Sequence, residues 1–238
     1  MVGLITFSLE LAPPGRMSVP WLAGTSVETG RSQSGISTSA DFSGGGMVAV
    51  KYGSIQLGNV LPARLKYWSQ LKAQLTGGTR SIIVPLMTDF ISPIVKLSGS
   101  VPFSDGSYFS DGSGFASFSG SAWLTADAAL NGGVISMQVQ GPVAALTGGE
   151  WFDLFHPTKL YRAYTVSDVL SVTGPDVNGI STYSLAIRPT IREAMLAGSV
   201  CNFYRPRCMM KLEPGTQMSG DVEKYWWSTP EISLIEAF

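Results

Sequence analysis

Charged side chains are scarce in this 238-residue sequence. Sixteen Lys and Arg residues and 17 Asp and Glu residues make up 14% of the chain, against roughly 25% in an average globular domain. The formal net charge is -1, and no run of Lys or Arg provides the basic surface with which proteins bind nucleic acid phosphates. Nucleic acid is therefore not expected as a specific partner.

Cysteine and histidine are also rare, which limits metal and disulfide chemistry. The two cysteines, Cys201 and Cys208, are seven residues apart, and His156 is the only histidine. This set provides neither a disulfide framework nor a Cys/His zinc site. We expect both cysteines to be buried apolar residues, and the sequence predicts no metal and no cofactor.

Long hydrophobic runs are absent. The longest apolar stretches, at 81–87 and 134–146, are interrupted by Pro, Gly, Gln or Ser and fall short of the 18 or more residues that a membrane span needs. The first residues, MVGLITFSLELAPPGR, lack the basic start and the cleavage site of a secretory signal. We therefore expect no membrane span and synthesis in the cytoplasm.

What the sequence does contain predicts a folded, mainly β protein. Hydrophobic residues make up 45% of the chain and aromatic residues 11%, enough for a substantial core. The 27 glycines and 14 prolines divide the chain into short strand-like segments. The expected fold is a set of β-sandwich or barrel-type domains, with a weakly charged surface used for contacts with other subunits.

One amphipathic helix is predicted at about residues 61–75. Pro62 is tolerated in a first helical turn, and Gly77 and Gly78 follow the segment. Apolar side chains recur with helical spacing and form a stripe: Leu61, Leu65, Trp68, Leu71 and Leu75.

Changes in composition suggest two parts, residues 1–95 with the helix and residues 96–238 as a β-sandwich or barrel-like part. In the first part, the Ser/Gly-rich stretch ETGRSQSGISTSADFSGGG, which includes Gly30 to Gly46, is predicted to be a hairpin arm or a loop. Its order before assembly is left open. The repeat FSDGSY/FSDGSG at 103–114 favours tandem Asp-Gly turns over a calcium loop, and its contact with a partner is also left open.

The sequence contains none of the common catalytic motifs, and we expect the protein not to be an enzyme. His156 would need an orienting carboxylate to act as a base, and Asp153 is the candidate, although a structural turn histidine is favoured. Paired carboxylates on separate strands could also form a glycosidase site. The carboxylates considered are Asp153, Asp168, Asp176 and Glu193, and turn capping is the favoured role for them. No catalytic, cofactor-binding or metal residue is assigned.

Six tryptophans allow an alternative function, a carbohydrate-binding β-sandwich of a virion or cell-surface protein. This alternative requires several of them on one exposed face, whereas core and interface positions are commoner for tryptophan. The six are Trp21, Trp68, Trp123, Trp151, Trp226 and Trp227.

The segment 181–212 has a distinctive pattern. A predicted strand reaches Arg188-Pro189, the residues IREAM are expected to form a short helical turn, and after Ala197-Gly198 a second strand returns from Phe203 to Leu212. We expect four arginines of this segment to lie close together and to bind carboxylates of the fold or of a neighbouring subunit: Arg188, Arg192, Arg205 and Arg207.

These motifs resemble those of distal tail and minor tail proteins of long-tailed, siphovirus-like bacteriophages. The resemblance rests on GEWF, LYRAYTV, IRPTIREAMLAGS, RPRCMMKL and SLIEAF, on the helix with Trp68 and Leu71, and on the pattern from Leu75 to Pro85. Thr190 stands where a second proline is common in the family pattern. The motifs do not separate a distal tail protein from a neighbouring hub component.

The resemblance implies a structural subunit of the tail tip in the virion, assembled in the bacterial cytoplasm. Such a subunit forms a homo-oligomeric ring, with a hexamer favoured, that joins the tail tube to the hub or baseplate and the receptor-binding parts. The implied partners are the tail tube protein, tail hub and tip proteins, and the tape measure protein. The sequence itself does not determine ring symmetry or host.

Overall fold

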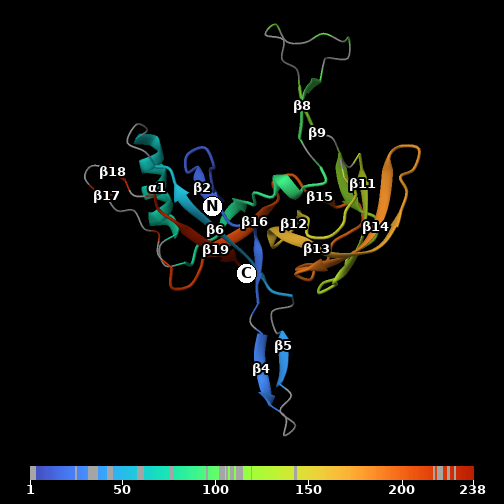
Figure 1. Ribbon diagram of the computed structural model, residues 1–238, viewed down its shortest axis with the longest axis horizontal. Helices are drawn as coiled ribbons and strands as arrows, with labels where there is room; N and C mark the ends of the chain where they lie inside the picture. Colours follow the sequence, from blue (N-terminus) through green and yellow to red (C-terminus); the bar gives the residue numbers. More distant parts are fainter. Residues whose placement is uncertain are drawn as a thin grey trace. The chain divides into compact units, whose positions relative to one another are not determined.

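The protein is described by a computed structural model in which the chain forms two compact units (Figure 1). The sheet unit contains Met1–Met87, Lys159–Arg162 and Arg207–Phe238, and the barrel unit contains Thr88–Thr158 and Ala163–Pro206. The structure describes residues 4–24, 26–31, 37–41, 45–57, 62–75, 78–94, 96–101, 105, 107, 110, 115–118, 120–141, 144–216, 218, 222–223, 226–227 and 229–238.

The sheet unit is built on a seven-stranded sheet whose strands come from both ends of the sequence. Their order is β1-β7-β16-β19-β6-β2, and β3 also pairs with β6. The strands are β1 (Ile5–Thr6), β2 (Pro14–Met17), β3 (Trp21–Ala23), β6 (Met47–Ile55), β7 (Ile82–Pro85), β16 (Arg207–Leu212) and β19 (Ile232–Glu236). Since β19 lies between β6 and β16, the C-terminal segment completes the centre of this sheet.

Helix α1 (Pro62–Leu75) confirms the predicted helix and also belongs to the sheet unit. Its buried side chains, Trp68, Leu71 and Leu75, are three members of the predicted stripe, and Gly78, at a φ of 65°, follows the helix. The hydroxyl of Tyr67 accepts a hydrogen bond from Ser8 N at 2.8 Å and connects the helix to the N-terminal segment.

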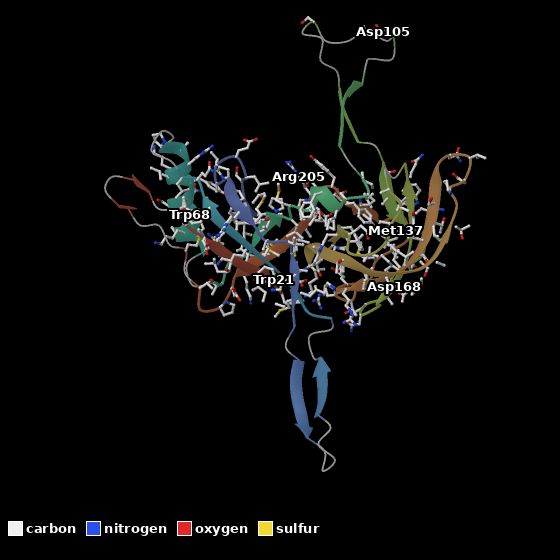
Figure 2. All side chains as sticks on the ribbon, in the orientation of Figure 1. Trp21, Trp68, Asp105, Met137, Asp168 and Arg205 are labelled. Carbon is white, nitrogen blue, oxygen red and sulfur yellow. The ribbon has the colours of Figure 1, made fainter. Side chains whose placement is uncertain are left out.

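The barrel unit contains a closed barrel of six strands in the order β10-β11-β14-β13-β12-β15. They are β10 (Ser121–Leu124), β11 (Val134–Gln140), β12 (Trp151–His156), β13 (Leu160–Thr173), β14 (Ile180–Arg188) and β15 (Val200–Asn202). Burial alternates along β11 and β14, so every second side chain faces the interior. Met137, labelled in Figure 2, is one of these core residues. A mainly β fold with one α-helix in the described chain confirms the predicted class.

Three two-stranded ribbons accompany the sheet and the barrel. Strand β4 (Ser26–Arg31) pairs with β5 (Ser37–Asp41), β8 (Lys96–Val101) with β9 (Phe115–Phe118), and β17 (Val222–Glu223) with β18 (Trp226–Trp227). The first ribbon lies in the stretch predicted as a hairpin arm. Within the described residues, each ribbon pairs only with itself (Figure 1).

Three local expectations differ from the structure. The alternation of Ile5, Phe7, Leu9 and Leu11 predicts a strand over LITFSLEL, but this segment contains only the short β1 and then turns at 9–11. The residues IREAM form no helical turn, because Met195 instead exchanges two backbone hydrogen bonds with Ala128. The returning strand, predicted from Phe203 to Leu212, begins only at Arg207 as β16 and lies in the sheet, whereas the preceding residues 200–202 form β15 in the barrel. β15 pairs with β10 and β12, so it does not return along β14.

The two units also differ from the contiguous parts 1–95 and 96–238 that composition suggested. The strands β16 and β19 and the short segment Lys159–Arg162 join the N-terminal residues in one unit. The barrel residues are therefore inserted between stretches of the sheet unit. Composition along the chain contains no signal for this arrangement, because it depends on which distant strands pair.

Candidate functional site

His156 lies at the end of β12 and is fully buried. Because side chains alternate along a strand, it shares the inner face of the barrel with the core residues Phe152 and Leu154. Its Nε2 lies 2.8 Å from the hydroxyl of Tyr164, which also accepts a hydrogen bond from Arg192 N at 3.2 Å. The Tyr164 hydroxyl then has its own proton to donate to Nε2. This arrangement gives His156 a structural contact inside the barrel.

Asp153 does not orient His156. The two residues are three positions apart on one strand, so their side chains point to opposite faces. Asp153 is buried, and its Oδ2 accepts a hydrogen bond from Asn202 Nδ2 at 3.2 Å on the adjacent strand β15. The pair that the sequence offered as a possible base and orienting carboxylate is therefore not brought together.

The other candidate carboxylates bind backbone N–H groups. Asp168, labelled in Figure 2, accepts from Val169 N at 2.8 Å, and Glu193 accepts from Thr158 N at 3.1 Å. Asp176 accepts from Ile180 N and Asn178 N, each at 2.8 Å. These hydrogen bonds, that of Ile180 first, lower the pKa of Asp176. Asp176 thereby stabilises the turn between β13 and β14, Asp168 bonds the backbone beside a bulge of β13, and Glu193 caps a distant turn at Thr158.

A cavity of about 300 Å³ in the barrel unit contains a carboxylate that the sequence analysis did not single out. Glu150 lies in its wall, together with the segments 90–93 and 144–149. Its oxygens accept hydrogen bonds from Thr147 N at 2.8 Å, Thr147 Oγ1 at 3.2 Å and Gly148 N at 2.9 Å. Among the described residues, Glu150 is the only carboxylate in the wall of this cavity, so these residues do not assemble the paired acids of a glycosidase here.

A second hollow, of about 510 Å³, lies on the sheet unit between β2 and β6. Gly15 and Gly53 lie in its wall and place no side chains in it. Lys51 Nζ forms an ion pair with Glu231 at 2.5 Å in the same wall. Both side chains of this pair are half exposed. The described wall of the hollow therefore combines an edge strand with an ion pair and contains one carboxylate, that of Glu231.

The cysteines are buried and unpaired with each other, as the sequence predicted. Burial, followed by the charge of Asp153, raises the pKa of the Cys201 thiol well above its ordinary value. No group of three or more His, Cys, Asp or Glu side chains in the described residues could hold a metal ion.

The arginines of the segment 181–212 belong to different units. Arg205, labelled in Figure 2, lies in the barrel unit and donates from Nε to Asp89 Oδ2 at 2.9 Å. Arg207 lies in the sheet unit, where its guanidinium is 3.8 Å from the centre of the Tyr161 ring. The expected carboxylate partner is therefore found for Arg205. Sequence reasoning missed the buried pair of Arg162 with Glu236, whose partners are 74 residues apart.

The described tryptophans do not form a common platform for a sugar. Trp68 and Trp151 are buried, whereas Trp21 and Trp123 belong to different units. The side chains of Trp226 and Trp227 and most of the FSDGSY/FSDGSG repeat lie outside the described residues. In that repeat, Asp105 accepts hydrogen bonds from Ser107 N at 2.9 Å and Ser107 Oγ at 2.6 Å, as in an Asp turn.

No family model matches the sequence, and a search of curated proteins finds no match to it. None of the helices in the described part of the chain is long and apolar enough to span a membrane.

Proposed function

We propose that this protein is a non-enzymatic structural subunit of a bacteriophage tail tip. In this role, copies of the chain form a closed ring, with six copies favoured, between the tail tube and the hub or baseplate. The proposal combines the sequence resemblance to distal tail proteins with the sparse surface charge. The ring would act in the virion, where it contacts tube, hub and tape measure proteins.

The observation that carries the proposal is the ribbon of β4 and β5. Its strands pair with each other, and the described residues contain no further strand beside them. A two-stranded ribbon is at best marginally stable in water. Each of its outer edges presents backbone N–H and C=O groups that another chain can pair with. Such a ribbon is stabilised when neighbouring subunits cover it.

Electron microscopy of the purified protein tests this function. We expect closed rings with a central opening, and class averages with sixfold symmetry. A variant in which residues 26–41 are replaced by a short Gly-Ser linker should retain its circular dichroism spectrum but lose the rings. Isolated particles of single-chain size at every concentration would overturn the proposal.

A further inference from the structure

Strand β13 extends beyond the strand that pairs with it on one side. Strand β12 begins at Trp151, and the last backbone hydrogen bonds on this side join Val166 to Glu150 at 2.9 Å and to Gly149 at 2.7 Å. On its other side, β13 continues to pair with β14 as far as Thr173 opposite Thr182. Residues 167–173 therefore have a strand neighbour on one side only within the described structure. We call them the free edge of β13.

The free edge is accessible and exposes two apolar side chains. Leu170 and Val172 are 53% and 57% exposed, and Asp168 is the only charged residue of the seven. Soluble proteins commonly protect long edges with charged residues, proline, bulges or a covering segment, and this edge contains no lysine and no proline. Two bulges interrupt its pairing with β14, after Val166 and after Val169, a feature common where an edge approaches a binding site.

We propose that the free edge of β13 binds the β8–β9 ribbon of a second copy of this chain by strand addition. The inference rests on the proposed function, because it describes a contact within the assembled ring. Strand β8, with six residues, is long enough to pair with most of the free edge, and each strand supplies the backbone groups that the other lacks.

Charge favours this ribbon over the β4–β5 ribbon. Lys96 is the only charged residue of β8 and β9 and complements Asp168 on the free edge. Strands β4 and β5 contain Glu28, Arg31 and Asp41, so their net charge has the same sign as that of the free edge. Like charges placed across a strand pair are unfavourable.

The geometry of the contact also suits a ring. The ribbon and the free edge are different surfaces of one chain, so each copy can donate its ribbon to the next copy and accept one from the previous copy. Such a head-to-tail contact generates a closed ring when the rotation between copies closes.

Lysine substitution tests the contact. The double variant Leu170→Lys, Val172→Lys places charge on the free edge at exposed positions, and its matched control is Val177→Lys, which changes a fully exposed valine in the turn after β13. We expect the light-scattering mass of the double variant to fall to that of one chain, while the control keeps the mass of the wild type. Circular dichroism and thermal unfolding show whether each variant is folded.

Disulfide formation provides a second measurement that does not depend on loss of assembly. Copies with Ser171→Cys are mixed with separately tagged copies with Ser100→Cys under mild oxidation. The native cysteines are buried, so the introduced cysteines are the accessible ones. We expect a disulfide-linked heterodimer, and no such product when Ser171→Cys is replaced by Ser233→Cys on β19 of the sheet unit.

The outcomes separate this inference from the function on which it rests. If the wild type assembles, the double variant assembles equally well and no cross-link forms, the strand-addition contact is wrong while the ring proposal stands. If the wild type has the mass of a single chain at all concentrations, the ring proposal fails and this inference fails with it. Loss of assembly together with the cross-link supports both.

Discussion

At the scale of single residues, a buried ion pair joins three distant segments of the sheet unit. Arg162 and Glu236 are 3% and 0% exposed, and their closest charged atoms are 3.4 Å apart. The second oxygen of Glu236 accepts from Val48 N at 3.2 Å, and Arg162 also donates to the carbonyl of Ala237. The pair therefore fixes the segment Lys159–Arg162 and strand β6 to strand β19.

We expect Glu236→Gln to destabilise the sheet unit by roughly 3–5 kcal/mol, because it leaves the charge of Arg162 buried without its counterion. The matched control is Glu231→Gln, which removes a half-exposed partner of Lys51 and should cost at most about 1 kcal/mol. Urea unfolding followed by circular dichroism measures both. Equal losses of stability in the two variants would contradict the structural role of the buried pair.

Cys201 gives stability a dependence on alkaline pH. Its folded-state pKa is raised by burial, whereas the unfolded thiol ionises near a pKa of about 8.5. Below that pH the thiol does not change the free energy of unfolding. As pH rises above it, the free energy of unfolding falls, because the unfolded state releases the thiol proton more readily than the folded state. The urea midpoint should fall less between pH 7.5 and pH 9.5 in Cys201→Ala than in the wild type. An identical fall in both proteins would contradict this assignment.

The sequence indicated some residue-scale features and missed others for a physical reason. Burial of both cysteines could be predicted because the chain has only two of them and they match no disulfide or zinc pattern. The separation of His156 and Asp153 also has a sequence signal, since residues three apart on a strand face opposite ways. The Arg162–Glu236 pair has no such signal, because two residues 74 positions apart meet only through the pairing of distant strands.

At the scale of elements, the local sequence pattern predicted the helix and the strand that reaches Arg188. The apolar stripe of α1 and the alternation of buried and exposed side chains along β11 and β14 depend only on neighbouring residues. The structure contains the helix and both strands. The segment IREAM has residues compatible with a helix, yet the long-range pairing of Met195 with Ala128 replaces the helical turn. Tertiary pairing therefore overrides local propensity at this point.

The pairing of β10 with β11 requires a glycine at position 120, immediately before β10. A Cβ at this position would lie 2.3 Å from the backbone oxygen of Gln140 on the adjacent strand β11. We expect Gly120→Ala to destabilise the barrel unit by about 1–3 kcal/mol through overpacking. At Gly133, the nearest atom to an added Cβ is Thr190 Cγ2 at 3.9 Å, so Gly133→Ala is the matched control. Thermal unfolding should show a lower midpoint for the first variant, and equal midpoints would contradict the close approach.

At the scale of the whole molecule, the chain combines a sheet unit made from both ends of the sequence with an inserted barrel unit. Its ribbons and its free strand edge expose backbone groups that a second chain can pair with. We interpret these features as those of a subunit that completes its pairing on assembly. Its stability should then depend on protein concentration.

The most direct test of this account is the mass of the purified protein in solution, measured by multi-angle light scattering over a range of concentrations. The account predicts a species with six times the 25.3 kDa mass of the chain, whose fraction grows with concentration. A constant mass of 25.3 kDa at every concentration would contradict the proposal that this chain forms a ring.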